Sequence, residues 1–319
     1  MPSLHRVALL FVLPMMAILL SGCPPRNPGG SAGPQGAGPS GRIAYQKLVA
    51  GSRWNIYVSN ADGTNEVVLV NGPENDEWPS LNRAAQSLVY VSNETGNADI
   101  FFMPLAGGTA TNMTVRAAED TTPDWGSNGK VAFASNVDGD FDIWVMDDSG
   151  ADKRPVWQGS SNANSCQDSE PAWSPDALKI AYTSDCGGAG FQLWVGVFDT
   201  VNGVSPARLA GIPGRHLVDP DWSPDGAKIV AESCSQTNNE DCDVIIMNAD
   251  GSNLRNLTNT PNIGEVDPKF SADGQFILFG HFAAGGTGLK IARMPVSGGA
   301  ATLINAAIND ARAPEPLPP

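Results

Sequence analysis

The chain contains nearly the same segment several times. Residues 219–233 read DPDWSPDGAKIVAES, and residues 171–184 read PAWSPDALKIAYTS. Related segments lie at 76–92, 120–135, 168–184, 217–233 and 265–280, with a large apolar residue at Leu81, Trp125, Trp173, Trp222 and Phe270, spaced by 44, 48, 49 and 48 residues. Self-similarity at roughly this period is typical of β-propellers built from four-stranded blades.

Each repeat predicts four short strands. The segment PxWS predicts an inner strand. SPDG predicts a tight turn, because Pro presets φ and Gly supplies the left-handed conformation that closes it. KIVAE, KIAYT and KVAFA are apolar on both faces, as expected for a second strand in a sheet packed between two others. DIWVMDDSG predicts the third strand, and a run such as LRNLT predicts the outer edge. We interpret the recurring Trp as a wedge between adjacent blades.

The two ends of the repeat region decide the number of blades. Residues 39–45 match 127–133, so the chain enters at the second strand of a blade whose inner strand is missing. The C-terminal residues 308–319 stand where that strand is expected, and pairing there closes the ring. The sequence therefore predicts an all-β fold, a six-bladed β-propeller of four-stranded antiparallel blades closed by the C-terminal segment. The alternative is an unclosed tail, because Pro cannot donate ladder hydrogen bonds.

The first forty residues differ from the repeats. His5 and Arg6 precede an apolar run at 7–20 that is short for a membrane-spanning helix. Leu20-Ser21-Gly22-Cys23 resembles the bacterial lipobox, in which the Cys thiol carries a lipid. An ordinary signal peptide with a chance Cys is the alternative.

The predicted division of the chain follows from this. Residues 1–22 are a lipoprotein signal peptide, 23–40 a flexible Pro/Gly tether and 41–316 the propeller. The lipobox resemblance implies export and anchoring in the cell envelope through a lipid on Cys23. Position 24 is Pro and not Asp, which implies the outer membrane, facing the periplasm, if the envelope is Gram-negative.

Four further cysteines agree with export. The midpoint of Cys166 and Cys186 falls in the predicted turn SPDA, and that of Cys234 and Cys242 falls in the polar loop SQTNNED. Each pair therefore lies opposite across a predicted hairpin, as a cross-strand disulfide requires. The alternatives are buried thiols or a metal site, but no CxxC pattern or neighbouring His supports a metal. Two disulfides are expected.

Charge and histidine content narrow the function. The formal net charge is -15 and the pI is near 4.4, so nucleic acid is a poor partner. Beyond His5 the only histidines are His216 and His281, which excludes a metal site made of three His. The single G-x-S-x-G, at 29–33, lies in the tether and lacks the strand and helix of a nucleophile elbow. No catalytic residue, metal or cofactor is assigned.

Residues 136–142, NVDGDFD, invite comparison with calcium loops. The register does not fit an EF-hand, because Gly139 at the sixth place puts Ala134 at the first. We interpret the segment as a polar hairpin tip, with weak surface calcium binding as the alternative.

Carboxylates recur before the predicted inner strands. They are Asp76, Asp120, Asp168 and Glu265, with Asp219 close to an equivalent place, and they are candidates for binding at one mouth of the central channel. The plainer interpretation is structural, with each carboxylate accepting backbone N–H bonds in the loop that enters its blade. The functional alternative is an acidic ring that selects a cationic peptide or a metal ion. Arg215 and His216 interrupt the pattern and are further candidates for a ligand contact, with a solvated loop pair as the alternative.

The repeat unit DxxP-x-W-SPDG-x-KI-A-x-S…DIWVMDADG…LT resembles that of TolB-like propellers over about residues 41–316. That resemblance implies a bacterial envelope protein with this fold. TolB carries an α/β domain before its propeller, whereas the tether here runs directly from Cys23 into the first blade, which puts a role in the Tol system in doubt.

Two functions are expected to compete. The first is a non-enzymatic, monomeric, lipid-anchored binding or scaffold protein that presents the channel mouth and loops to an envelope protein or peptide. The second is a carboxylate- or metal-dependent hydrolase or lyase acting on polysaccharide or peptide. A structural envelope protein without a specific ligand is a third option, since a propeller fold does not fix a function.

Overall fold

The structure is a computed structural model. It describes residues 41–49, 53–82, 86–157, 166–198, 206–238, 241–260, 263–283, 288–304 and 310–316. The predicted signal peptide, lipidation residue Cys23 and tether lie outside the described residues. Every regular element in the described part of the chain is a β-strand. Within these ranges there is no helix with the length and apolar character needed to span a membrane.

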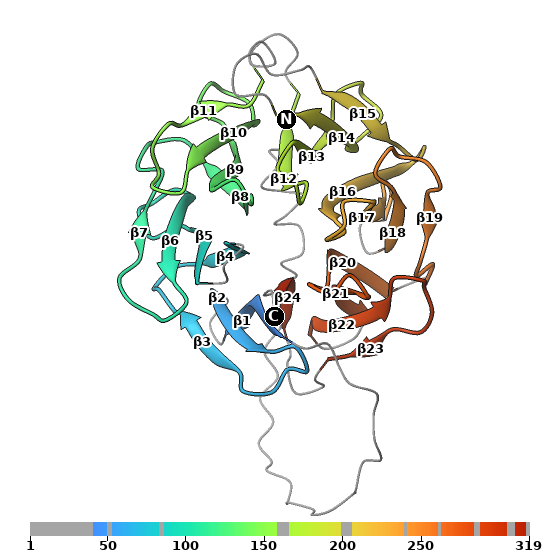
Figure 1. Ribbon diagram of the computed structural model, residues 1–319, viewed down its shortest axis with the longest axis horizontal. Coiled ribbons are helices and arrows are strands. Elements are labelled where there is room, and N and C mark those ends of the chain that lie inside the picture. Colours follow the sequence, from blue (N-terminus) through green and yellow to red (C-terminus); the bar gives the residue numbers. More distant parts are fainter. Residues whose placement is uncertain are drawn as a thin grey trace, which may run out of the picture. The chain divides into compact units, whose positions relative to one another are not determined.

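The described residues form six four-stranded antiparallel sheets arranged as blades around a centre (Figure 1). The blades, each from inside to outside, are as follows. Blade 1 is β24 (Ala311–Pro316), β1 (Arg42–Val49), β2 (Arg53–Asn60) and β3 (Val67–Val70). Blade 2 is β4 (Asp76–Leu81), β5 (Ser87–Ser92), β6 (Asp99–Pro104) and β7 (Thr111–Asn112), and blade 3 is β8 (Asp120–Trp125), β9 (Lys130–Ser135), β10 (Asp142–Asp147) and β11 (Arg154–Pro155). Blade 4 is β12 (Asp168–Trp173), β13 (Lys179–Ser184), β14 (Gln192–Val197) and β15 (Ala207–Ala210). Blade 5 is β16 (Arg215–Trp222), β17 (Lys228–Ser235), β18 (Cys242–Asn248) and β19 (Arg255–Asn256), and blade 6 is β20 (Ile263–Phe270), β21 (Phe276–Ala283), β22 (Lys290–Pro295) and β23 (Thr302–Leu303).

The ring closes through the C-terminal strand. β24 pairs antiparallel with β1, with Ile43 opposite Pro316 and Lys47 opposite Ala311. The backbone N–H of Ala311 also donates to the carbonyl of Leu289 in blade 6, at 3.1 Å. The predicted closure is confirmed, and the unclosed tail is excluded. The inner edge of β1 is thereby covered, so that it cannot pair with another chain.

The SPDG turns owe their shape to a serine and an aspartate. In blade 5, Ser223 Oγ donates to Asp225 Oδ1 at 2.6 Å, and that oxygen accepts the N–H of Ala227 at 3.0 Å. Gly226 has a φ of 70° and closes the turn. Blade 4 places Ala177 there at a φ of 53°, so the same turn forms without glycine at some cost in strain.

The recurring large residue is a wedge between blades, as predicted. Trp222 of blade 5 packs against Ala172, Ala181 and Leu193 of blade 4. Trp173 packs against Ala132 and Ile143 of blade 3, and Phe270 packs against Val230 and Val244 of blade 5. The core is therefore a series of inter-blade layers, with second strands that are buried on both faces.

Both expected disulfides are present. Cys166–Cys186 joins the segments just outside the paired ends of β12 and β13, with a Cα–Cα distance of 5.1 Å. Cys234 and Cys242 are direct partners in the β17–β18 ladder, with a Cα–Cα distance of 4.0 Å. Each bridge lies within one blade and fixes one hairpin.

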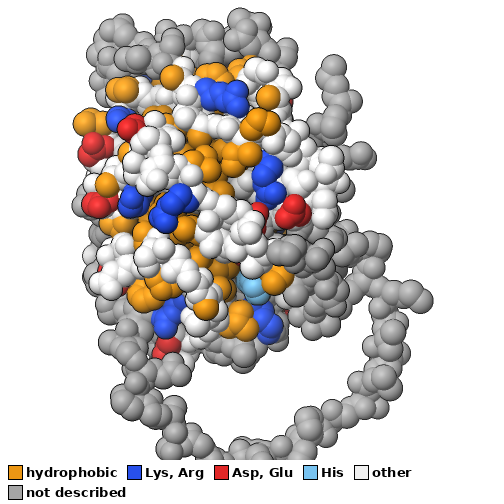
Figure 2. All heavy atoms as spheres, turned by 90° about the vertical axis from the view of Figure 1, so that its right-hand side faces the viewer, with side chains coloured by type: hydrophobic (Ala, Val, Ile, Leu, Met, Phe, Trp, Pro, Cys, Tyr) orange, Lys and Arg blue, Asp and Glu red, His pale blue; other side chains and the backbone are white. Residues whose placement is uncertain are grey.

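One side of the molecule is seen in Figure 2. Its Lys and Arg side chains lie in separate places, divided by hydrophobic and uncharged polar atoms. This distribution agrees with the absence of a basic block in the sequence.

Candidate functional site: the central pocket

A central pocket lies among the six innermost strands. Its lining comes from β4, β8, β12, β16, β20 and β24, which are the inner strands of blades 2, 3, 4, 5, 6 and 1. The lining residues are Trp78, Pro79, Ser80, Thr122, Pro123, Asp124, Glu170, Pro171, Asp219, Pro220, Asp267, Lys269, Ala313 and Glu315. Every blade thus contributes to the pocket through the same short stretch of its repeat.

The stretch is a bulge that recurs in all six inner strands. The residue before the proline has a φ between 46° and 53° in each case, and the register with the second strand shifts at the same place. These six residues are Trp78, Thr122, Glu170, Asp219, Asp267 and Ala313, and none is glycine. Left-handed backbone at a non-glycine residue costs about 1–3 kcal/mol, and such residues cluster at functional sites. The bulge turns these residues toward the centre.

Side chains of the preceding blade stabilise the bulges. The N–H of Asp219 donates to Glu170 Oε2 at 2.9 Å. The N–H of Ala313 donates to Asp267 Oδ2 at 3.2 Å, and the N–H of Asp267 donates to Glu232 Oε2 at 3.1 Å. Pocket carboxylates therefore bond the backbone of the next blade, which joins neighbouring blades around the pocket.

The carboxylates are crowded on one side of the pocket. Burial raises the pKa of Glu170, Asp219, Glu232 and Asp267, and for Asp219 the charges of Glu170 and Asp267 raise it further. Oxygens of Asp219, Glu232 and Asp267 lie within 4.8 Å of one another. Oxygen donors at this spacing suit a hard cation such as Ca²⁺ or Mg²⁺. Arg312 partly neutralises the group, because its charge lowers the pKa of Glu232 and Asp267.

A second group of charged side chains in the pocket surrounds Lys269. Lys269 Nζ lies 3.7 Å from Asp221 Oδ1. Burial disfavours the charged amine, but the carboxylates of Asp221, Glu315 and Asp124 outweigh burial and raise its pKa. Burial raises the pKa of Glu315 to about 8, although the charge of Lys269 opposes the shift. This second group therefore contains one amine and several carboxyl groups.

Arg312 connects the closing strand to the pocket wall. It is buried, and its guanidinium lies 5.1 Å from the ring centre of Trp54 and 5.0 Å from that of Trp78. Cation–π contacts with two aromatic faces fix its position. The ring closure and the electrostatics of the pocket thus depend on the same strand.

Four predicted carboxylates do not line the pocket. Asp76, Asp120, Asp168 and Glu265 are at most 6% exposed, and each has a partner near its own strand. Asp76 accepts the N–H of Gly72 at 3.0 Å, Asp120 pairs with Arg116 at 2.7 Å, and Glu265 accepts from Thr260 Oγ1 at 2.6 Å. The structural interpretation of the DxxP carboxylates therefore fits their position better than the acidic ring. Of the carboxylates predicted from the sequence, Asp219 alone lies in the pocket.

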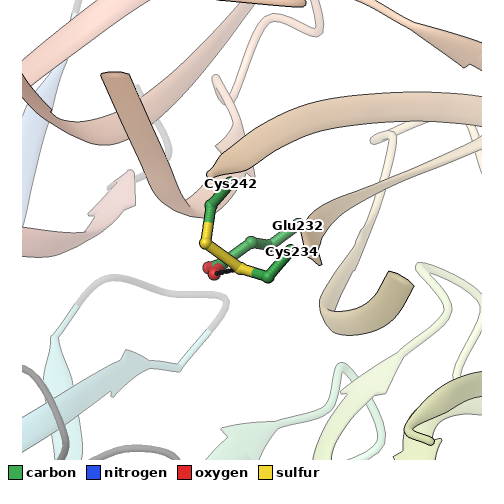
Figure 3. A group of neighbouring side chains, drawn as sticks. All are labelled: Glu232, Cys234 and Cys242. Carbon is green, nitrogen blue, oxygen red and sulfur yellow. Dashed lines mark hydrogen bonds between the residues drawn. A yellow bond between two sulfur atoms is a disulfide. The ribbon is translucent and has the colours of Figure 1, made fainter. Parts of the chain in front are cut away.

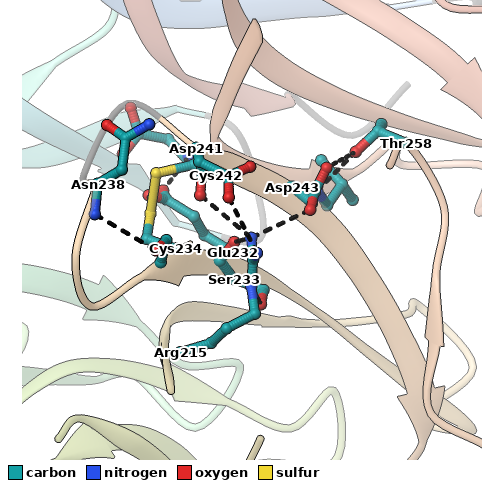
Figure 4. Close-up of a disulfide and its surroundings, with 12 residues drawn as sticks. Arg215, Glu232, Ser233, Cys234, Asn238, Asp241, Cys242, Asp243 and Thr258 are labelled. Carbon is teal, nitrogen blue, oxygen red and sulfur yellow. Dashed lines mark hydrogen bonds and ion pairs between the residues drawn. A yellow bond between two sulfur atoms is a disulfide. The ribbon is translucent and has the colours of Figure 1, made fainter. Parts of the chain in front are cut away.

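The side chain of Arg215 is held by contacts with neighbouring strands of its own blade (Figure 4). Its Nε donates to Ser233 Oγ at 2.7 Å, and its Nη2 donates to Asp243 Oδ2 at 3.0 Å and to the carbonyl of Asp241 at 3.1 Å. These contacts tie β16, β17 and β18 together. The side chain is occupied by blade 5, and the pocket lining does not include it.

His216 also contacts the protein. Its Nδ1 accepts the N–H of Phe191 at 3.1 Å, and its ring lies 5.5 Å from that of Phe191. Burial lowers the pKa of the imidazole, so it is neutral at pH 7. The other described histidine, His281, lies 3.7 Å from Glu265 Oε1. Neither belongs to the pocket lining.

Glu232, which accepts the N–H of the pocket residue Asp267, also lies against a disulfide (Figure 3). Its Oε1 lies 2.7 Å from Sγ of Cys234, which is bonded to Cys242. A disulfide sulfur has no hydrogen to donate, so only a protonated carboxyl group can donate a hydrogen bond in this contact. Burial first and then the charge of Asp267 raise the pKa of Glu232, which favours the protonated form.

The sequence interpretation missed most of the pocket residues. It chose the first position of DxxP, whereas the bulge brings the third position and the position after the proline into the pocket. A signal was present, since Glu170, Asp219 and Asp267 are acids at one repeat position, spaced by 49 and 48 residues.

Comparison with known proteins agrees with the fold. Residues 40–232, more than half of the chain, match the family model of the TolB beta propeller domain. A TolB homologue of Protochlamydia amoebophila (strain UWE25) is 28% identical over 170 residues, which are 50% of this chain and 36% of that protein. The chain spans about a third of the length of the curated relatives it matches.

Solved structures show the same architecture. TolB from Acinetobacter baumannii superposes with a TM-score of 0.74 at 24% identity, over 89% of this chain and 68% of that one. An oligogalacturonate lyase in complex with manganese superposes with a TM-score of 0.51 at 11% identity, over 84% and 74% of the two chains. At these identities the likeness concerns the fold alone.

Proposed function

This chain belongs to the TolB beta propeller family, and on that premise we propose that it is a non-enzymatic binding protein of the cell envelope. Its central pocket and the loops around it bind a protein or peptide partner through a segment that carries positive charge. Rigid inner strands hold the pocket in a fixed shape, which suits recognition of a partner without a large rearrangement.

The charge of the pocket is the observation that carries this proposal. Five carboxyl groups and one amine line it, namely Asp124, Glu170, Asp219, Asp267, Glu315 and Lys269. An acidic concave surface with low-dielectric walls focuses a negative potential and raises the association rate of a cationic partner. The left-handed residues at the six bulges place these groups at a cost in strain, which also supports a functional role.

The proposal includes a lipid anchor. Cys23 in the sequence LSGC is the lipidation residue, and the tether that follows it gives the propeller reach from the membrane. The outer membrane is the proposed location in a Gram-negative envelope. A Cys23→Ser variant is expected to lose the mass of the lipid and to leave the membrane fraction.

Crosslinking in native membranes, followed by affinity purification, tests the binding role. A Glu170→Gln/Asp219→Asn variant keeps an acceptor oxygen at position 170 for the N–H of residue 219 but removes two acidic groups from the pocket. It is expected to recover a basic partner at least tenfold less efficiently than the wild type. The matched control is Glu74→Gln/Asp148→Asn, which removes two charges at exposed positions. Equal recovery of the partner by both variants would show that the pocket does not bind it.

An enzyme is the competing function. The clustered oxygens of Asp219, Glu232 and Asp267, and the fold likeness to a lyase that binds manganese, are the observations that favour it. A panel of polysaccharide and peptide substrates, with and without Mn²⁺, Ca²⁺ or Mg²⁺, distinguishes the two. Turnover that disappears in Asp219→Asn would establish the enzyme and reject the binding role as the sole function.

A further inference from the structure

An acidic group lies at the junction of blades 3 and 4, away from the central pocket lining. Asp138 and Asp140 are in the connection between β9 and β10, and Asp142 is the first residue of β10. Each offers a carboxylate oxygen, and these oxygens lie within 4.8 Å of one another. The exposure falls along the series, with Asp138 exposed and Asp142 only 4% exposed.

A fourth carboxylate, from the next blade, lies close enough to this group for its charge to act on Asp142. The N–H of Asp168, the first residue of β12, donates to the carbonyl of Phe141 at 2.8 Å. This bond places Asp168 beside Asp142, although Asp168 begins the inner strand of blade 4 and Asp142 begins the third strand of blade 3. We call Asp138, Asp140, Asp142 and Asp168 the junction cluster.

Two oxygens of the junction cluster are buried and have no partner among the described residues. Asp142 Oδ2 and Asp168 Oδ1 are inaccessible to solvent and make no hydrogen bond to that part of the chain. The two residues are 4% and 6% exposed. A buried carboxylate oxygen without a donor is costly, so an oxygen of this kind calls for a cation or a proton.

The charges in the junction cluster repel one another. Burial raises the pKa of Asp142 to about 7, and the charges of Asp138, Asp168 and Asp140 add to the effect. Burial likewise raises the pKa of Asp168 to about 7, with Asp185 and Asp140 adding and a hydrogen bond to Ser184 opposing. Several negative charges therefore meet here with few donors to balance them.

The preceding junction shows how the same position is satisfied elsewhere in the ring. Between blades 2 and 3, the N–H of Asp120 donates to the carbonyl of Ala98 at 2.8 Å, which repeats the backbone geometry. There, Arg116 donates to both oxygens of Asp120, at 2.9 and 2.7 Å. Asp99, the counterpart of Asp142, accepts from Thr95 at 2.6 Å and from Asn112 at 2.7 Å.

The sequence supplies no such cation at the junction cluster. Arg116 stands four residues before Asp120, whereas Asn164 stands four residues before Asp168. Residues 158–165 contain no Lys, Arg or His. This junction therefore lacks the positive charge that Arg116 supplies at the preceding one, and it carries two more acids, Asp138 and Asp140, at the hairpin tip.

We propose that the junction cluster is a calcium site that joins blade 3 to blade 4. Carboxylate oxygens from two blades match the oxygen ligands of Ca²⁺, which accepts six to eight of them in a flexible geometry. Mg²⁺ fits less well, because it demands a near-octahedral shell and keeps much of its water. The exposed Asp138 leaves room for water ligands, and a dissociation constant of about 0.1–1 mM, as in extracellular modules, is expected.

Thermal unfolding of the full-length protein with EDTA and with increasing CaCl₂ tests the site. Calcium that binds only the folded state raises Tm with its concentration, and a rise of a few degrees at 10 mM is expected. Titration calorimetry with CaCl₂ is expected to show one calcium site that depends on Asp142. MgCl₂ at equal concentration should give a smaller rise.

Substitutions separate this site from the central pocket. Asp142→Asn is expected to abolish the calcium-dependent rise in Tm, while its Tm in EDTA equals or exceeds that of the wild type, because a repelling charge has gone. An equal or higher Tm in EDTA shows that the variant still folds, so the loss of the calcium-dependent rise in Tm reflects loss of calcium binding. Asp219→Asn is the matched control in the pocket and is expected to keep the response.

Two results would contradict the calcium site. No rise in Tm and no binding heat up to 10 mM CaCl₂ would overturn the calcium site. A response that survives in Asp142→Asn but disappears in Asp219→Asn would also overturn it, and would assign the cation to the central pocket.

Discussion

Trp222 Nε1 donates a hydrogen bond to the carbonyl oxygen of Ala172, at 3.1 Å and 50 residues earlier in the chain. The bond joins the wedge residue of blade 5 to the inner strand of blade 4. At the equivalent place in blade 4, Trp173 Nε1 is buried and has no hydrogen-bond partner in the part of the chain that the structure describes. Two residues with the same role in the repeat thus differ by one hydrogen bond.

The two tryptophans are expected to respond differently to loss of the indole N–H. Trp222→Phe should cost about 1–2 kcal/mol more in unfolding free energy than Trp173→Phe, because it leaves the Ala172 carbonyl without a donor. Trp222→Ala should cost about 3–5 kcal/mol through the cavity it creates. Urea unfolding measures both. Val115→Ala, at a side chain that is 79% exposed, is the control and should change little. Equal costs for the two Phe variants would contradict the assigned bond.

Removal of the closing strand is expected to destabilise the whole ring. A chain that ends at Asp310 leaves the inner edge of β1 unpaired and loses the buried side chains of Ala311, Arg312 and Ala313. It should unfold at a lower temperature and form oligomers, because an exposed edge pairs with other chains. Thermal unfolding and size-exclusion chromatography measure the two effects, with a chain that ends at Pro316 as control. An unchanged Tm would show that β24 does not contribute to stability.

The disulfides are expected to stabilise single hairpins. By the loss of loop entropy in the unfolded chain, each bridge contributes about 2–3 kcal/mol. Reduction should therefore lower the Tm of the wild type but leave a variant with Ala at Cys166, Cys186, Cys234 and Cys242 unaffected. A thiol assay confirms that the bridges have opened. Full reduction without a change in Tm would contradict the expectation.

Stability should fall as the pH rises through the neutral range, in part because of Glu315. Its pKa is about 8 in the folded protein and 4.5 ordinarily, so the folded state binds the proton more tightly. This contribution is complete below about pH 4.5 and is lost as the pH rises toward 8. Glu315→Gln should make the decline between about pH 5 and 8 shallower, by the order of 1 kcal/mol, since solvent in the pocket screens the group. Urea unfolding at a series of pH values tests this, with Glu74→Gln as control, and parallel curves for the variant and the wild type would exclude the effect.

The sequence predicts the arrangement of strands and blades well, because that arrangement is periodic. The spacing of Trp125, Trp173 and Trp222 gives the blades, and the match of residues 39–45 to a second strand gives the closure. The disulfides follow from their position opposite each other in hairpins. Each of these inferences needs only the order of strands and their antiparallel pairing.

The pocket was harder to predict because it depends on a local departure from regular strand geometry. In a regular strand, side chains alternate, and the bulge before each proline interrupts that alternation. Asp168 was therefore expected at the channel mouth, although it lies beside Asp142 of another blade. Contacts between blades, such as this one, join residues that strand pairing within a single blade does not bring together.

The pairing of β24 with β1 also sets the order in which the molecule can be completed. β24 is made after all the other described strands, so β1 waits for its partner until blades 2 to 6 have been synthesised. Until then, blades 2 to 6 form an open arc, and the hydrophobic side chains of Ile43 and Tyr45 lack the cover that Ala311 provides. Blade 1 is therefore the last blade to be completed, and its unpaired strand is exposed to aggregation for the longest time during folding.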